Sequence, residues 1–309
     1  MRAKLSEDAG ASAATPGQFF RSPGFLAAEG VTHTLEIDTN PPLRAPLIVR
    51  EIPGGGGRDA TSPYGYPGAA GGPEEPPEAS EVDWSGTGLV TAFIRDRIGA
   101  PSLAGGPARS SVSLADPRRE SGVRKRMREQ IRANERRGWS VGVETGPDSD
   151  PADRAAFRAA YEQTMHRTGA SERYLFTAEY FDTVLAEPSA WLLLAGRSGA
   201  APEAGAIAVT SDGHLHYFLG GTAEGALADS PMKNLFAAMI ALAGELGLIL
   251  NLGGGVVPGD SLDQFKRRFA NDSAEFRTHE IVCDAAAYAR LSPGDPAPEG
   301  FFPAYRAGR

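Results

Sequence analysis

The feature that most constrains the fold is a long apolar helix pattern that leads directly into a buried strand. Four large apolar side chains within residues 230–246 fall on one face of a helix, namely Leu235, Met239, Leu242 and Leu246. Gly247 ends that helix, and the apolar run 248–255 then has the composition of a buried strand that finishes in three glycines. This succession requires a sheet with a helix packed on at least one face.

The elements around this helix indicate the kind of sheet. The turn signal Ser-Asp-Gly at 211–213 joins two predicted strands into a hairpin. The strands expected before the long helix are 190–197, 203–211 and 214–221. Helices are expected at 151–167, 177–186 and 260–270, and a last strand at 275–283. The order favours an α/β fold with mixed (α+β type) sheets, and not a doubly wound parallel sheet.

The N-terminal half has a weaker pattern. The first 18 residues are small and polar, so we expect a mobile tail there. Strands are predicted at 33–38 and 44–52, and a helix at 85–98. Between them, residues 53–78 contain 14 Gly or Pro in 26 positions, which predicts a segment without regular structure.

Composition and charge exclude several classes of protein. The 309 residues include 31 basic and 39 acidic ones, and the formal net charge of −8 means that any nucleic-acid contact must be local. The single cysteine, Cys283, excludes an internal disulfide and a multi-cysteine zinc site. Only His214 and His216 have a spacing that suits a metal, and a hydrogen-bonded strand pair explains them more simply, so we expect no metal. With no signal-like apolar segment and no run long enough for a bilayer, we expect a soluble, cytoplasmic protein.

One segment is strongly basic. Residues 117–139 hold nine basic and three acidic residues in an otherwise acidic chain. A helix over 118–137 places four arginines in a stripe beside Lys125: Arg124, Arg128, Arg132 and Arg136. The stripe is either a local contact for a polyanion or the solvated face of a linking helix, partly balanced by Glu129 and Glu135.

A candidate site lies where the buried strand ends. Gly253, Gly254 and Gly255 let a substrate approach the backbone closely, or they form only a turn. In the next predicted helix, Phe265 and Phe269 share a core-facing side, and Lys266 stands beside them at the glycine-rich strand end. A lysine there can place positive charge where an oxyanion develops. The alternative is a solvated basic cluster over 266–268. Triad, zinc-protease and Walker motifs are absent from the sequence.

Together these segments resemble a known family. In order and spacing, YFLGGT (217–222), SPMKNLFAAMIALAGELG (230–247), LNLGGGV (250–256) and GDSLDQFKRRF (259–269) resemble the C-terminal subdomain of Fem-type transferases, of the FemAB-like group of GNAT-fold proteins. FFRSPGFL, SPYGYPG and KRMREQIRANERRGW are similar to further family landmarks. The resemblance covers residues 18–290 and is most specific over 160–290.

The resemblance implies a fold and a site. It implies two tandem GNAT-like subdomains after the tail 1–18: an abbreviated one over 19–117 and a second over 118–309 with the basic linking helix 118–137. In such a fold two neighbouring strands splay apart around the acyl donor. Here these would be 214–221 and 248–252, with Gly220, Gly221 and the glycines 253–255 beside the acyl group. Phe265 and Lys266 match the family's Phe-Lys pair, whose lysine stabilises the oxyanion or orients the substrate.

The resemblance also implies an enzyme, an aminoacyltransferase that moves an aminoacyl group from aminoacyl-tRNA to the amine of a peptide-like acceptor. Because that ester is already activated, the protein need only align the amine and stabilise the oxyanion, without a cofactor. Fem ligases of cell-wall synthesis carry a helical hairpin for which this chain has no long charged heptad segment. A peptide natural-product (antibiotic) intermediate, which can be carrier-bound, is therefore favoured over a peptidoglycan precursor.

Under this interpretation the basic stripe holds the tRNA, and Tyr64 and Tyr66 line the acceptor site or, alternatively, pin their loop to the protein body. One rival is an acyl-CoA-dependent N-acetyltransferase of the same fold, with acetyl-CoA as donor. Against it, residues 220–234 lack the pyrophosphate-binding turn, and Asp229 at the helix start would repel an anion. The third class of function we consider is a non-catalytic binding module of the same fold.

Overall fold

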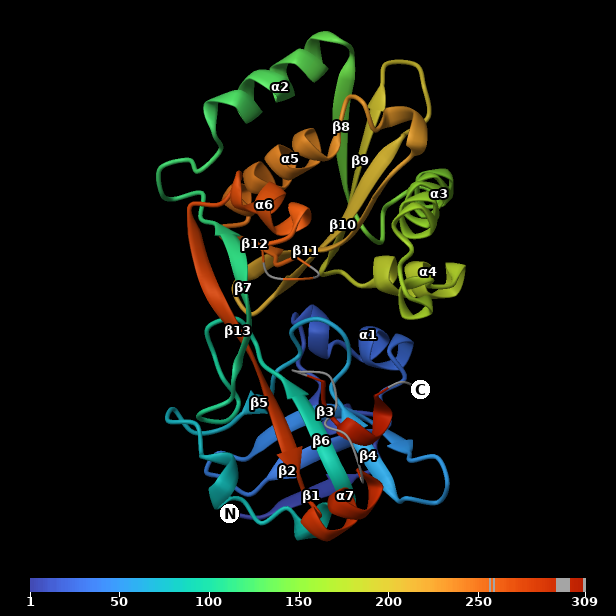
Figure 1. The fold of residues 1–309 in the computed structure, drawn as a ribbon. Coiled ribbons are helices and arrows are strands. Elements are labelled where there is room, and N and C mark those ends of the chain that lie inside the picture. The colour runs from blue at the N-terminus through green and yellow to red at the C-terminus, as the bar shows by residue number, and fades with distance from the viewer. Residues whose placement is uncertain (256, 258, 293–300, 308–309) are drawn as a thin grey trace. The chain divides into compact units, whose positions relative to one another are not determined.

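The computed structural model describes residues 1–255, 257, 259–292 and 301–307 (Figure 1). The chain divides into two compact units, which are described separately. Unit 1 consists of Met1–Pro16, Phe20–Arg109 and Glu275–Arg309, and unit 2 of Gly17–Phe19 and Ser110–Ala274. This division differs from the predicted boundary between residues 117 and 118, because the chain returns to unit 1 after residue 274.

Unit 1 is built on a mixed sheet. Its strands are β1 (Ala3–Ser6), β2 (His33–Ile37), β3 (Leu43–Glu51), β4 (Arg58–Thr61), β5 (Ala70–Gly71), β6 (Leu89–Arg95) and β13 (Asp272–Val282). The order is β1-β2-β3-β4-β6-β13, with β5 beside β3, and every pairing is antiparallel except β4 with β6. The helices of this unit are α1 (Pro23–Ala28) and α7 (Ala285–Leu291).

Three predictions for this half are wrong. Within the expected mobile tail, β1 pairs in register with β2, and Ala3 is fully buried. The expected helix over 85–98 is instead strand β6, because its apolar side chains are buried between β4 and β13. The segment expected to lack regular structure contains β4 and β5.

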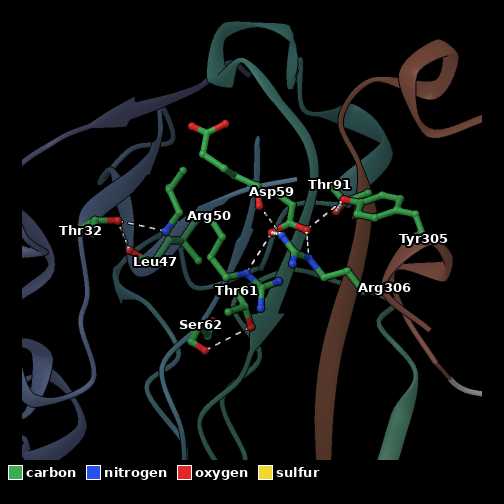
Figure 2. A network of polar contacts seen from close by, with 11 residues as sticks. Thr32, Leu47, Arg50, Asp59, Thr61, Ser62, Thr91, Tyr305 and Arg306 are labelled. Carbon is green, nitrogen blue, oxygen red and sulfur yellow. Dashed lines mark hydrogen bonds and ion pairs between the residues drawn. The ribbon is translucent and has the colours of Figure 1, made fainter. Parts of the chain in front are cut away.

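A buried carboxylate ties the C-terminal residues to the sheet of unit 1. Asp59 on β4 is inaccessible to solvent and accepts hydrogen bonds from Arg50, Arg306 and the Tyr305 hydroxyl (Figure 2). The Tyr305 hydroxyl also lies 2.7 Å from the Thr91 hydroxyl on β6. Since a buried charge is costly without partners, these contacts make residues 304–306 part of the unit.

Unit 2 carries the second mixed sheet. Its strands are β7 (Ala108–Ala115), β8 (Trp139–Thr145), β9 (Ala190–Arg197), β10 (Ala204–Ser211), β11 (His214–Thr222) and β12 (Ile249–Gly253). The order is β7-β12-β11-β10-β9-β8, and only β11 and β12 run parallel. The strands predicted at 190–197, 203–211 and 214–221 and after Gly247 are therefore confirmed as β9 to β12, whereas β7 was not predicted.

Helices cover both faces of this sheet. They are α2 (Lys125–Arg136), α3 (Pro151–Thr168), α4 (Ala178–Ala186), α5 (Met232–Glu245) and α6 (Ser261–Arg267). Helices α2 and α5 pack on one face, and α3 and α4 on the other (Figure 1). Leu235, Met239 and Leu242 of the predicted stripe on α5 are buried in the core of the unit, whereas Leu246 is 38% exposed. No helix in the described part of the chain is long and apolar enough to cross a membrane.

The basic helix belongs to unit 2 rather than linking two subdomains. It begins at Lys125, seven residues later than predicted, with Arg124 as its N-cap. Met127 and Ile131 face the core shared with α5, and the Asn134 side chain donates a 2.8 Å hydrogen bond to Asn234 of α5. The exposed side of the helix is therefore fixed by the packing of its other side.

Candidate functional site

The parallel strands at the centre of the unit 2 sheet separate after a short pairing. Strands β11 and β12 pair only at His214–Ile249, Leu215–Leu250 and His216–Asn251. Beyond this point β11 continues to Thr222 along β10, where the register shifts around Phe218. The pairing thus ends where the resemblance implies that strands 214–221 and 248–252 splay apart.

A buried amide and imidazole mark the point of separation. Asn251 Nδ2 lies 3.0 Å from His216 Nδ1, and Asn251 Oδ1 accepts a 2.8 Å hydrogen bond from the Gly253 amide. Burial, together with the charge of His214, lowers the pKa of His216 to about 3, so its imidazole is neutral. Among the described residues, no cluster of three His, Cys, Asp or Glu side chains is arranged to hold a metal ion.

Lys266 is fixed at the glycine-rich end of β12. The Asp260 side chain caps α6 by accepting a 2.7 Å hydrogen bond from the Asp263 amide. From this helix the Lys266 side chain, 6% exposed, donates a 2.7 Å hydrogen bond to the Gly254 carbonyl. Its Nζ also lies 5.4 Å from the centre of the Tyr217 ring on β11. The solvated basic cluster therefore does not describe Lys266.

Burial controls the electrostatics of this lysine. It lowers the pKa of Lys266 to about 8, although the negative charges of Asp260 and Asp263 act in the opposite direction. Burial also raises the pKa of the Tyr217 hydroxyl to about 12, so that ring is neutral and offers its face to the ammonium. Lys266 is thus mostly protonated at neutral pH, in surroundings that solvate it poorly.

The two phenylalanines of α6 differ in burial. Phe269 is fully buried, and its ring meets Phe236 of α5 edge to face at 5.3 Å. Phe265 is only half-buried, with ring centres 5.3 Å from Phe236 and 5.5 Å from Phe269. Phe269 therefore anchors the helix, and Phe265 forms the partly open edge of the aromatic cluster beside Lys266.

The glycines predicted to line the site fall into two groups. Gly253 has a left-handed backbone (φ +73°), and a side chain on Gly255 would collide with the Asp260 carboxylate. On β11, a side chain on Gly220 would collide with the Tyr217 ring, whereas Gly221 faces the backbone of α3 at Tyr161. Gly220, Tyr217, Lys266 and Gly254 thus form a continuous set of contacts, and Gly221 allows close helix packing instead.

The two predicted acceptor-site tyrosines lie in unit 1, and the lysine site lies in unit 2. Tyr64 and Tyr66 are both half-buried. The Tyr66 ring meets Phe20 and Phe276 edge to face at 5.7 and 5.1 Å, and the Tyr64 amide donates to the Glu29 carboxylate at 2.8 Å. These contacts fit the loop-pinning alternative within unit 1, and an acceptor role stays a prediction.

The predicted basic residues are exposed on α2 and its N-cap: Arg124, Lys125, Arg128, Arg132 and Arg136. Lys125 lies 3.9 Å from Glu129, and the Arg128 guanidinium donates to the Val123 carbonyl.

Asp229 behaves differently from the prediction. Its carboxylate pairs with Arg137 and Arg197 and accepts a hydrogen bond from the Trp139 indole, so it does not face an incoming anion as an unbalanced charge.

Two residues that contribute to the site were not predicted from the sequence. Tyr217 and Asn251 stand in the quoted segments YFLGGT and LNLGGGV, but neither has a spacing that distinguishes it from an ordinary strand residue. Only the bulge around Phe218 and the end of the β11–β12 pairing give these two residues their places. No local pattern in the sequence contains that information.

Part of the chain matches a known protein family. Residues 121–267 match the family described as "Acetyltransferase (GNAT) domain", a span that includes the β11–β12 pair and Lys266. No curated protein sequence matches the chain.

The fold is similar to that of several solved structures. FemX is 12% identical with a TM-score of 0.58, over 83% of this chain and 89% of that one. The C-terminal domain (DUF2156) of a putative lysylphosphatidylglycerol synthetase from Agrobacterium fabrum is 15% identical with a TM-score of 0.59, over 87% and 89%. L-PGS from Bacillus licheniformis is 12% identical with a TM-score of 0.55, over 85% and 87%. These likenesses extend over both units and confirm the predicted fold class, a mixed α/β fold with GNAT-like architecture.

Proposed function

We propose that this protein is an N-acyltransferase whose acyl donor lies between β11 and β12, beside Lys266. The observation that carries the proposal is the buried ammonium. A lysine ammonium has three donors, and among the described residues only the Gly254 carbonyl accepts one of them. A buried charge with unused donors is costly in an empty site and becomes favourable when an oxyanion accepts from it.

The reaction that suits this arrangement is aminolysis of an ester. The acceptor amine attacks the carbonyl carbon, a C–N bond forms, and the bond from that carbon to the ribose oxygen of the donor breaks. The proton lost by the amine ends on the released ribose hydroxyl. Lys266, with a pKa of about 8, is protonated at about ten to one at pH 7 and can donate to the oxyanion of the tetrahedral intermediate.

We further propose aminoacyl-tRNA as the donor. The chain has a net charge of −8, so a polyanion must bind at a basic surface, and the exposed side of α2 provides one. One of the structurally similar proteins is named as the C-terminal domain of a putative lysylphosphatidylglycerol synthetase, a name that favours an aminoacyl over an acetyl group. The acceptor is the amine of a peptide-like molecule, with a natural-product intermediate favoured and Tyr64 and Tyr66 as its proposed contacts.

An acyl-CoA-dependent N-acetyltransferase is the second candidate. Its support is the balanced charge of Asp229, which removes the repulsion expected at the start of α5, together with the name of the matched family. The two candidates share the lysine and differ in the donor.

The test is to incubate the protein separately with labelled aminoacyl-tRNA and labelled acetyl-CoA, each with a panel of peptide amines. Amide-linked label from the tRNA, reduced about 100-fold or more in Lys266→Ala, supports the proposal. Label from acetyl-CoA alone supports the second candidate. Transfer from neither donor contradicts both.

A further inference from the structure

A small basic pocket lies beside the start of α2 in unit 2. It is lined by Arg124, Arg126, Met127 and Arg268 and has a volume of about 210 Å³. The Arg124 amide donates a 3.3 Å hydrogen bond to the Arg268 carbonyl, so the N-terminus of α2 and the C-terminus of α6 are joined here. Met127, which also lines the pocket, is buried in the core of the unit.

Among the residues that the structure describes, the arginines that line this pocket have no acidic partner. Other arginines of this unit are paired: Arg118 with Asp116, and Arg137 with Asp229. Within the described ranges, Arg124, Arg126 and Arg268 form no ion pair. Lys233 on α5 is half-buried and experiences the positive charges of both Arg126 and Arg268. Burial and then these two positive charges lower its pKa, and Asp229 opposes them only in part. Like charges held together in this way are unfavourable unless an anion binds among them.

The pocket is connected to the lysine site through α5 and α6. Arg268 follows Lys266 by two residues, and Lys233 precedes Phe236 by three, so it lies on the same side of α5. Phe236 contacts both Phe265 and Tyr217, with ring centres 5.3 and 5.1 Å away. The pocket and the lysine site therefore share helices α5 and α6.

We propose that Arg124, Arg126 and Arg268, which line the pocket, bind a phosphate group of the acyl donor. The planar fork of an arginine suits two oxygens of one phosphate, and the clustered positive charges attract its negative charge. This inference rests on the proposed function and gives it a second contact point. In an aminoacyl-tRNA the group is a phosphodiester near the acylated 3′ end, and in acyl-CoA it is a phosphate or pyrophosphate.

The pocket overlaps the predicted basic stripe only at Arg124. Arg126 and Arg268 are not members of that stripe, and Lys233 comes from another helix. The stripe is a solvated surface for several phosphates of an extended polyanion, whereas the pocket would hold one phosphate at a fixed distance from the reaction.

The test is binding of two donor fragments, the trinucleotide CpCpA and CoA, to the folded protein and to Arg126→Ala/Arg268→Ala. Both side chains are exposed, so we expect an unchanged melting midpoint. Arg158→Ala, on α3 at the opposite face of the sheet, is the matched control. We expect the double variant to bind its donor fragment about 10-fold or more weakly. The slope of log K against log salt should fall by about 0.7 for each lost single-strand phosphate contact. Arg126→Lys/Arg268→Lys should recover part of the affinity.

The outcomes separate the two proposals. Weakened binding of CpCpA supports both the pocket and the tRNA donor, and weakened binding of CoA alone supports the pocket while contradicting the tRNA donor. Equal binding by the double variant, Arg158→Ala and the unaltered protein overturns the pocket, even where Lys266→Ala still abolishes transfer. If the unaltered protein binds neither fragment, the pocket is also overturned.

Discussion

Replacing Lys266 with methionine should make the protein more stable and almost inactive. Lys266 is 6% exposed, and burial lowers its pKa from 10.5 to about 8. At 1.36 kcal/mol per pKa unit, keeping it charged in the folded state costs about 3 kcal/mol at pH 7. Methionine has a similar length and carries no charge. It loses the bond to the half-buried Gly254 carbonyl, worth about 1–2 kcal/mol, so the variant should gain about 1–2 kcal/mol.

The pH dependence has a definite sign. A lysine whose folded pKa lies below its unfolded pKa destabilises the protein fully below the folded value and not at all above the unfolded value. The stability advantage of Lys266→Met should therefore be largest below pH 8 and shrink as the pH rises from 8 to 10.5. At the same time, loss of an oxyanion donor should reduce turnover by about 100-fold or more.

The assay pairs calorimetric melts of both proteins at pH 7 and pH 10 with single-turnover transfer of labelled aminoacyl groups. Lys266→Arg serves as the control because it keeps the charge. Should Lys266→Met melt below the unaltered protein at pH 7, the ammonium is stabilising and the reasoning from burial fails. Should it turn over at the original rate, Lys266 has no part in the chemistry.

Three further predictions follow from contacts in unit 2. Gly221→Ala should lower stability by about 1–3 kcal/mol through overpacking against the α3 backbone, measured by urea unfolding, and unchanged stability would mean that α3 can move away. Phe269→Ala should cost about 3–5 kcal/mol and Phe265→Ala clearly less, because only Phe269 is fully buried; equal losses in thermal melts would contradict that difference. Arg128→Glu/Arg132→Glu should raise the KM for charged tRNA and weaken its salt dependence, and an unaltered KM at two salt concentrations would leave α2 a structural helix only.

Local patterns predicted the elements of unit 2 well because they carry their own signals. The hairpin of β10 and β11 has its turn at Asp212–Gly213, and the stripe on α5 has helical spacing. β6 was assigned wrongly because a short, continuously apolar run is equally consistent with a buried helix and with a strand buried on both faces. Only its pairing with β4 and β13 decides between them.

Long-range partners explain the other failures. β7 has an unremarkable local sequence and acquires its structure from β12, more than 130 residues later. At the site, too, contacts between residues close in sequence were predicted and contacts between distant residues were not. Lys266 and Gly254 lie 12 residues apart and were placed together from the sequence, but the partners of Asp229 are 92 and 32 residues away. Arg126, Lys233 and Arg268 likewise come from three separate segments.

The central claim is that the acyl group of the donor binds between β11 and β12 against Lys266. The most direct measurement is a crystal structure with a stable analogue, an aminoacyl group joined by an amide to the 3′ end of CpCpA. We expect the acyl carbonyl oxygen about 2.7–3.1 Å from Lys266 Nζ, with the adjoining chain beside Gly254 and Tyr217. An acyl group bound away from the β11–β12 separation, with Lys266 still bonded only to Gly254, would contradict it.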